Sequence, residues 1–256
     1  MRVWRSRLFA GVDSLALLFA LLAIWWFGSH SGAVNRLFLP TPEATILVLT
    51  TGLRDGTVGA QALATVIRML IGWLLASIVG IGLGAVIGIS AGARRMFQPV
   101  LEFVRPLPAS ALLPLAIAIF GLNANMVLSV VAFGAMWPVL LTTVHGFANV
   151  QPRLLEVAHC LRLSKQAFIW KIGIPNATPD ILTGMRLSMT TSLTLSVVGE
   201  MIASQDGLGL SMLYAARNFR SADLFAGIAL VALIGLASNT ILGMAERRLL
   251  RWQQSQ

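Results

Sequence analysis

The sequence predicts an all-α polytopic membrane protein with about six transmembrane helices in one domain, residues 1–256. Of its 256 residues, 57% are hydrophobic and only 11% are charged, and the mean hydropathy is +0.80. Soluble globular domains carry about 25% charged residues. The apolar residues also come in runs that match the roughly 20 residues that a helix needs to cross a bilayer. Together these observations argue against a soluble protein.

The first span begins close to the N-terminus. A basic start followed by an apolar run resembles a secretory signal peptide, but this run leads into Trp25, Trp26 and Phe27 without a small-residue cleavage site. We therefore expect it to be retained as a helix. The six expected spans cover residues 9–28, 68–90, 99–120, 125–147, 180–202 and 223–245.

The basic residues predict the orientation of these spans. The net charge of +9 could suggest a nucleic-acid partner, but the basic residues are scattered beside apolar spans and form no continuous stripe, which argues against one. With the N-terminus inside, twelve basic residues fall on the cytosolic side and four outside, and Arg68, Arg105 and Arg186 lie at or inside span edges. This asymmetry predicts that both termini are cytosolic.

The outer segment 29–67 contains a short helix signal. Thr41 can cap a helix that has Pro42 in its first turn. We favour a helix that lies on the membrane surface over a contact site for a soluble partner.

The longest basic, amphipathic stretch lies between the fourth and fifth spans, in the cytosolic loop 149–179. Pro152 suits the first turn of a short helix that continues over 153–161. Ala158 has no bulk, so a partner surface could come close to this helix. A structured cytosolic loop in a small membrane protein favours a docking site for a soluble partner, and the alternative is an ordinary interfacial loop.

A second short helix is expected in the same loop. Ser164 can cap it, and it should run through Trp170 to Gly173. Gly173 permits a turn of the chain, and Pro175 should stop any continuation of the helix. The loop should therefore hold two short helices at an angle, both lying across the membrane face.

The residue spacing in this loop resembles the EAA loop of ABC-importer permeases. The matching residues are Glu156, Ala158, Ile172, Ile174 and Pro175, and Arg162 stands where the family has Gly. Other segments are similar, in order, to the permeases of nitrate/sulfonate/taurine importers: L-P-T-P at 39–42, R-P-L-P at 105–108, A-L-L-P-L at 111–115, F-G at 120–121, I-L-T-G-M-R-L at 181–187, G-E-M-I at 199–202 and G-L-G at 207–209.

This resemblance implies a type I ABC importer permease fold in a bacterial inner membrane. The implied partners are a second permease copy in a homodimer, two cytosolic ATPase subunits, a periplasmic or lipid-anchored solute-binding protein, and membrane lipid. The chain would be a non-catalytic subunit without a cofactor of its own, because the ATPase would bind ATP and Mg. Its solute would be small and polar or anionic, such as a sulfonate or nitrate. The residues expected to couple to the ATPase are Glu156, Ala158, Cys160, Arg162, Ile172, Ile174 and Pro175.

Two spans carry regular patterns of small or polar residues. In the second span Gly80, Gly84 and Gly88 recur every four residues, which predicts close packing of another helix. In the fifth span a hydroxyl stripe recurs at the same interval. Its face either lines the route of the solute or packs against another helix. The stripe consists of Ser188, Ser192 and Ser196, with Thr191 beside it.

Charged residues inside spans point to function by default. Arg105, near the inner end of the third span, is a candidate for the solute route, and Glu102 lies three residues earlier, where the two can pair. The alternative is that both side chains extend to the interface. Glu200, near the outer end of the fifth span, is expected to be solvated there.

The motifs of common enzymes and metal sites are missing. The sequence contains no Walker A motif, no H-E-x-x-H and no G-x-S-x-G, and His30, His145 and His159 are not grouped. The single cysteine excludes a disulfide framework and a multi-cysteine metal site. No catalytic residue or metal ligand is therefore assigned. An ATP-independent secondary carrier remains the alternative function, although the halves show no inverted repeat and no chain of acidic residues.

Overall fold

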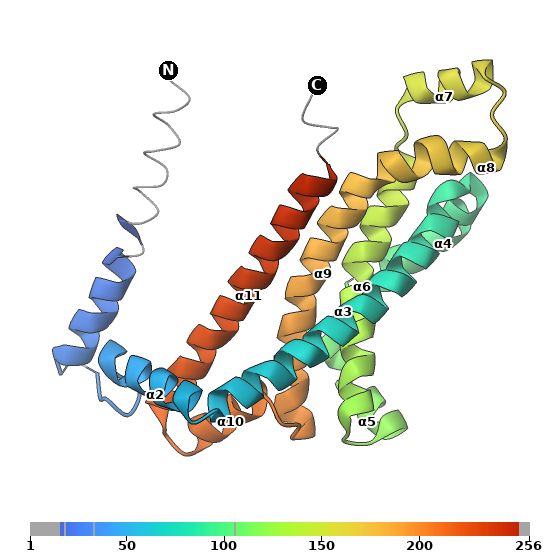
Figure 1. The fold of residues 1–256 in the computed structure, drawn as a ribbon. Coiled ribbons are helices and arrows are strands. Elements are labelled where there is room, and N and C mark those ends of the chain that lie inside the picture. Colours follow the sequence, from blue (N-terminus) through green and yellow to red (C-terminus); the bar gives the residue numbers. More distant parts are fainter. Residues whose placement is uncertain (1–15, 18, 33, 105, 251–256) are drawn as a thin grey trace, which may run out of the picture. The chain divides into compact units, whose positions relative to one another are not determined.

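The computed structural model describes residues 16–17, 19–32, 34–104 and 106–250, which form helices and connecting loops without a strand. The chain divides into two compact units. The first unit comprises residues 1–60 and 211–230, and the second unit comprises residues 61–210 and 231–256. Figure 1 shows the order of the helices, and three of them cross from one unit to the other.

The first unit holds short helices. An apolar helix covers Phe19–His30, and α2 covers Pro42–Arg54. Thr41 caps α2 by accepting a hydrogen bond from the Ala44 amide at 3.2 Å, and Pro42 lies in the first turn, so the expected helix start is confirmed. The unit also includes most of α10 (Leu208–Arg217). Of the expected span 9–28, residues 16–17 and 19–28 are helical as expected, and residues 9–15 and 18 lie outside the described residues.

Long apolar helices dominate the second unit. Among the described residues, four helical stretches are long and apolar enough to cross a membrane. They contain the expected spans 125–147, 180–202 and 223–245 in full, while the helices of the second and fifth spans begin earlier than expected. These stretches include α3 (Thr57–Ile89), α6 (Ala124–Ala148), α9 (Ile174–Ala203) and α11 (Ser221–Leu249).

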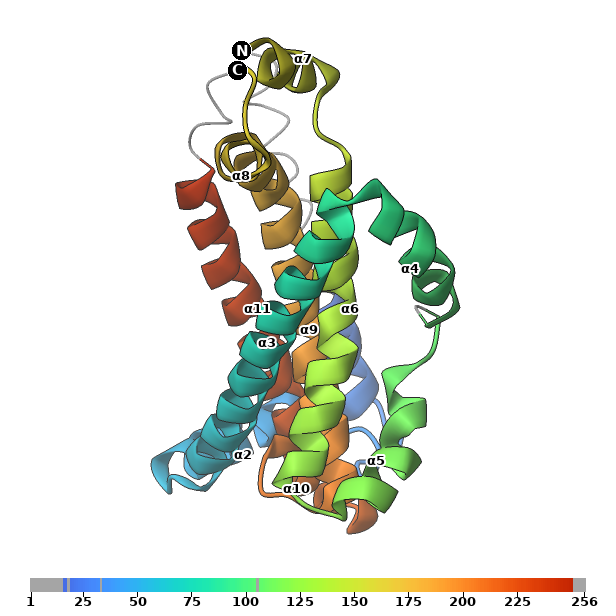
Figure 2. The ribbon, with the colours of Figure 1, turned by 90° about the vertical axis from the view of Figure 1, so that its right-hand side faces the viewer.

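The expected span 99–120 is not one continuous helix. The chain forms α4 (Ala91–Val104), then the short helix η1 (Ala109–Leu112) and α5 (Leu113–Phe120). The two halves are bent by 83°, and Figure 2 shows α4 and α5 as separate rods. The bend coincides with Pro106 and Pro108. A proline lacks the amide donor that a helix interior needs and disfavours helix in the residue before it, which accounts for the break.

Glycines bring α3 against α6 in the second unit. A Cβ at Gly80 would lie 3.0 Å from the Met136 carbonyl oxygen, and one at Gly88 would lie 2.7 Å from Cβ of Phe147. These positions have no room for a side chain, so the glycine groove serves helix packing as expected. Both views show α3, α6 and α9 side by side (Figures 1 and 2). The buried core near α5, α6 and α9 includes Leu113, Met126, Val127, Val131 and Leu195.

Candidate functional site

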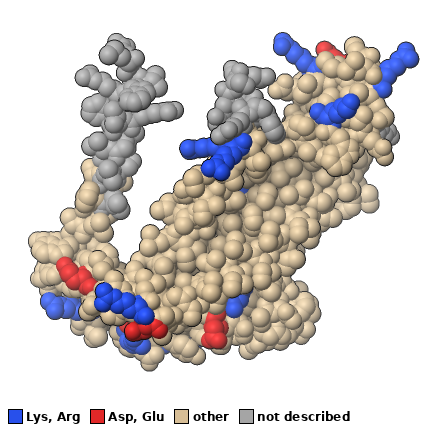
Figure 3. Space-filling model, viewed as in Figure 1, with Lys and Arg blue, Asp and Glu red and all other residues tan. Residues whose placement is uncertain are grey.

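The loop between α6 and α9 contains the separate helix α7 (Pro152–Cys160), at one end of the second unit (Figure 1). Pro152 occupies its first turn, so the expected helix over 153–161 is confirmed to within one residue. Lys and Arg side chains gather around this end in Figure 3. The outer face of α7 combines charged, thiol and apolar side chains, namely Glu156, Val157, Cys160 and Leu161, all of which are exposed.

Arg162 ends α7 in a left-handed turn. Its φ is +47°, the region that glycine favours. The Arg162 amide donates to the His159 carbonyl at 3.0 Å, and the Leu163 amide donates to the Ala158 carbonyl at 3.0 Å. This pair of bonds is the Schellman arrangement, in which the left-handed residue is usually glycine. The turn therefore has the shape that a glycine would give it, and Arg162 adopts it at a cost of about 1 kcal/mol.

Ala158 faces the chain itself. Its side chain is 9% exposed, and it lines a cavity of about 480 Å³ together with Leu163 and Phe168. A direct contact between Ala158 and a partner surface therefore stays a prediction. The small side chain of Ala158 allows α7 to approach the residues that precede α9.

The second short helix of the loop is not separate from the following span. Ser164 caps α8 (Lys165–Phe168) by accepting a hydrogen bond from the Ala167 amide at 3.2 Å, as expected. The π-helical turn η2 (Ile169–Gly173) then leads directly into α9. Gly173 has a helical φ of −61°, so it does not turn the chain.

Pro175 does not stop the helix either, because it lies in the first turn of α9, where a missing amide donor is tolerated. The change from π to α register at this point lets the chain pass a proline without a break. Ile172 and Ile174 are half-buried on either side of Gly173, and Pro175 is exposed.

The hydroxyl stripe of α9 lies between helices. Ser188 donates to the Ala135 carbonyl of α6 at 2.6 Å, and Ser192 donates to the Met69 carbonyl of α3 at 2.7 Å. Both serines and Ser196 are 0% exposed, whereas Thr191 bonds within its own helix, to the Leu187 carbonyl at 3.1 Å. A fully buried hydroxyl cannot line a solute route in this conformation. The geometry therefore favours the packing alternative. Arg105, the other route candidate, lies outside the described residues.

Sequence reasoning missed a buried polar cluster in the second unit. Glu200 is 0% exposed, so the expectation that it is solvated at the interface is wrong. Its carboxylate pairs with the Arg68 guanidinium and accepts hydrogen bonds from the Thr65 hydroxyl at 3.0 Å and the Gly209 amide at 2.9 Å. The Leu208 amide in turn donates to the Thr65 hydroxyl at 2.9 Å. The sequence offered one signal: Arg68 and Glu200 carry opposite charges, and each lies at the edge of an expected span.

The G-L-G segment follows from this cluster. A Cβ at Gly209 would lie 2.9 Å from Cβ of Glu200, and a Cβ at Gly207 would collide with the Glu200 carboxylate. The chain after α9 can reach the buried carboxylate only because these two residues have no side chain. The cluster thus ties this loop to α3.

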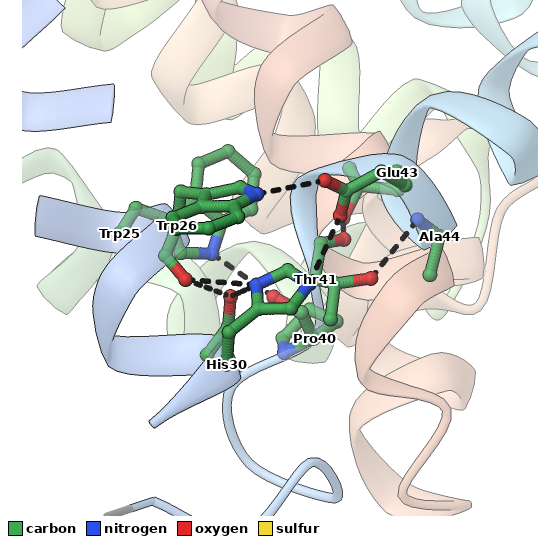
Figure 4. Close-up of polar contacts among 9 residues, drawn as sticks. Trp25, Trp26, His30, Pro40, Thr41, Glu43 and Ala44 are labelled. Carbon is green, nitrogen blue, oxygen red and sulfur yellow. Dashed lines mark hydrogen bonds and ion pairs between the residues drawn. The ribbon is translucent and has the colours of Figure 1, made fainter. Parts of the chain in front are cut away.

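In the first unit, polar contacts join the helix Phe19–His30 to the start of α2 (Figure 4). The Trp26 indole donates to Glu43 at 3.0 Å and stacks on the His30 ring, with 4.6 Å between centroids. The Trp25 indole donates to the Pro40 carbonyl at 3.0 Å. The backbone amide of Glu43 lowers the pKa of its carboxyl below the usual value, and the bond from Trp26 acts in the same direction. These contacts hold the L-P-T-P segment in place.

The family follows from a comparison with known proteins. Residues 76–251 match the family model described as binding-protein-dependent transport system inner membrane component. The chain belongs to this family. Among the described residues, no group of three or more His, Cys, Asp or Glu side chains could hold a metal ion.

Relatives of this transport component cover nearly the whole chain. It is 31% identical to the taurine transport system permease protein of Escherichia coli (strain K12), over 97% of this chain and 93% of that protein. It is 28% identical to the bicarbonate transport system permease protein of Synechococcus elongatus, over 98% of this chain and 94% of that protein. A crystal structure of an amino acid ABC transporter with histidines matches its fold, with a TM-score of 0.65 at 18% identity over 78% of this chain and 97% of that one. The fold is that of a type I ABC permease.

Proposed function

We propose that the chain is the membrane-spanning subunit of an ATP-driven importer and that the loop between α6 and α9 couples it to a separate ATPase. The observation that carries this proposal is α7. It is a short helix outside the long apolar helices, and its exposed face combines Glu156 with Val157 and Leu161, which are 49% and 66% exposed. An amphipathic helix of this kind suits a groove on a soluble partner.

The loop also has the stiffness that coupling needs. The Schellman turn at Arg162 fixes the angle between α7 and the segment that follows, and the π turn joins α8 to α9 without a flexible break. A displacement of α7 by a partner would therefore pass into α9. The buried bonds of Ser188 and Ser192 would carry it on to α6 and α3.

The remaining parts of the proposal rest on the family and the charge distribution. The family name implies a solute-binding protein. We propose a homodimer of this chain with two ATPase subunits, which bind ATP and Mg, and with both termini in the cytosol. The names of two relatives support a small polar or anionic solute. One name contains taurine, which is a sulfonate, and the other contains bicarbonate.

Labelling of Cys160 tests the docking site. Cys160 is the only cysteine of the chain and is exposed, so a membrane-impermeant thiol reagent should modify the purified permease at one position. Modification should slow when the ATPase subunit is bound. As a matched control, Cys160→Ser combined with Asp55→Cys moves the thiol to an exposed residue outside the loop, where the ATPase should not change the rate.

Transport measurements extend this test. Glu156→Lys should leave membrane insertion intact and uncouple ATP hydrolysis from uptake, because it reverses a charge on the exposed face of α7. Equal labelling of Cys160 with and without the ATPase would remove the docking proposal. Uptake that continues without any ATPase subunit would instead indicate a secondary carrier.

A further inference from the structure

A polar cavity of about 580 Å³ lies between α9 and α11 in the second unit, and no residue of the coupling loop or of the Glu200 cluster is among its described lining residues. The two helices are in close contact next to it, because a Cβ at Gly235 would lie 3.3 Å from Leu193. Toward the C-terminal end of α11 they leave room for the cavity. Its polar lining consists of Arg186, Asn239, Thr240, Glu246 and Arg247.

The charges of this cavity favour an anion. The described lining contains two arginines, Arg186 and Arg247, and one carboxylate, Glu246. The Arg186 guanidinium donates to the side-chain oxygen of Asn239 and lies 3.6 Å from the Glu246 carboxylate, while Arg247 forms no ion pair with any residue that the structure describes. The pair is half-exposed, with Arg186 at 45% and Glu246 at 24%, so it neutralises Arg186 only weakly. Within the described part of the chain, the positive charge of Arg247 therefore has no ion-pair partner.

The position of the cavity suits the headgroup of a lipid. The Arg186 guanidinium, at one end of the cavity, lies near Gly243. Gly243 is six residues before Leu249, the last residue of α11, which corresponds to about 9 Å along the helix axis. Residues of α11 spaced by three and four run from Arg247 through Met244 to Leu236 on one face. Met244 and Leu236 are 53% and 64% exposed. A charged end followed by an exposed apolar strip matches a phosphate followed by an acyl chain.

We propose that this cavity is an oxyanion site, which binds the phosphate of an anionic membrane lipid or a free anion of the same chemistry through Arg186 and Arg247. Asn239 orients the Arg186 guanidinium, and Thr240 offers a hydroxyl donor. Basic cavities between membrane helices recognise lipid phosphates in this way. The proposal needs only that the chain spans a membrane and does not depend on the proposed coupling loop.

A variant of Glu246 should change the affinity for an anion in the opposite direction from variants of the two arginines. Glu246 is the only carboxylate among the described residues that line the cavity, so it repels an anion and competes with it for Arg186. Glu246→Gln should therefore tighten anion binding, whereas loss of a purely structural ion pair would not. Arg247→Gln should weaken binding about fivefold, the effect of one arginine near a membrane surface. Arg186→Gln should do at least as much.

The experiment uses the full chain purified in detergent. Native mass spectrometry measures the apparent affinity for the first added phosphatidylglycerol, with zwitterionic phosphatidylcholine as the comparison lipid. Arg248→Gln is the matched control, because Arg248 is in the same last turn of α11 and does not line the cavity. It should leave the first binding event unchanged. If Arg186→Gln does not fold, Arg247→Gln and Glu246→Gln still decide the question.

Calorimetry with inorganic phosphate and with ethanesulfonate forms the second arm. The pattern of variants seen with phosphatidylglycerol alone identifies a lipid site, and the same pattern with a free anion identifies a soluble ligand. Either outcome supports the oxyanion site. Equal effects of Arg247→Gln and Arg248→Gln in both arms, or no tightening by Glu246→Gln in either, would overturn it.

Discussion

Arg68 on α3 and Glu200 on α9, 132 positions apart in the sequence, form an ion pair in which the carboxylate is completely buried. The pair does not stand alone, because Thr65 and the amide of Gly209 also donate to Glu200. A buried charge is tolerated when it is paired and hydrogen-bonded in this way, and removal of one partner leaves the other uncompensated. Removal of one member of the pair should therefore destabilise the second unit.

Glu200→Gln should lower the free energy of unfolding by about 3 kcal/mol, because Arg68 then loses its charged partner. Arg68→Gln should have a similar effect. The double variant should be less destabilised than the sum of the two by about 1 kcal/mol or more, since the residues are in direct contact. The apparent melting temperature in detergent measures all three.

An exposed ion pair provides the control for this comparison of the single and double variants. Arg220 and Asp223 pair at 2.6 Å on the surface, with Arg220 67% exposed. Arg220→Gln should change the stability by less than about 1 kcal/mol. Strict additivity of the Arg68 and Glu200 variants would show that the two side chains do not interact in the folded protein.

The glycines of α3 should differ sharply in their tolerance of a methyl group. A Cβ at Gly84 would lie 2.6 Å from Cβ of Thr143 and 2.9 Å from the Leu140 carbonyl oxygen, whereas a Cβ at Gly82 meets nothing within 4 Å. Gly84→Ala should therefore lower the melting temperature. Gly82→Ala should be neutral or stabilising, by up to about 1 kcal/mol, because alanine is the better helix former. Equal melting temperatures of the two variants would contradict the close contact between α3 and α6.

The long helices could be predicted from the sequence because their signal is local. The expected span 125–147 became α6, Ala124–Ala148, and Asn123 caps it through a bond from the Met126 amide at 3.0 Å. The bend in the third span was not predicted, although Pro106 and Pro108 are visible, because a proline can either kink or end a membrane helix. Pro175 led to the opposite error, since the π turn before it could not be foreseen.

The candidate sites depended more on tertiary packing. The four-residue spacing of Ser188, Ser192 and Ser196 predicts correctly that they share a face of the helix. The spacing does not say which part of the protein that face contacts. The structure shows carbonyls of α6 and α3 there. The Arg68–Glu200 pair was missed for the same reason, because two charges at the edges of different spans become partners only through the arrangement of the helices.

The left-handed turn at Arg162 should respond to glycine. Arg162→Gly removes the Cβ from a residue with φ of +47° and should relieve about 1 kcal/mol of backbone strain. Arg153→Gly, in the first turn of α7, has no such strain to relieve and should destabilise by up to about 1 kcal/mol. Hydrogen exchange at the amides of α7 would show the difference, as slower exchange in the first variant and faster exchange in the second. Faster exchange in both would indicate that Arg162 holds the turn through its side chain.

The hydroxyl stripe of α9 should respond as a packing surface. Ser192 is 0% exposed and donates to Met69, so Ser192→Leu should prevent correct assembly of the helices before it affects transport. Ser192→Ala should be mild, because a hydroxyl bond between membrane helices contributes only about 0.6 kcal/mol. Thr194→Leu is the matched control, since Thr194 is exposed on the same helix and its hydroxyl donates within that helix, to the Thr190 carbonyl. The yield of folded protein and the uptake of solute must be measured separately for each variant. A well-folded Ser192→Leu protein with no uptake would return Ser192 to the solute route, and normal folding together with normal uptake would contradict both readings of the stripe.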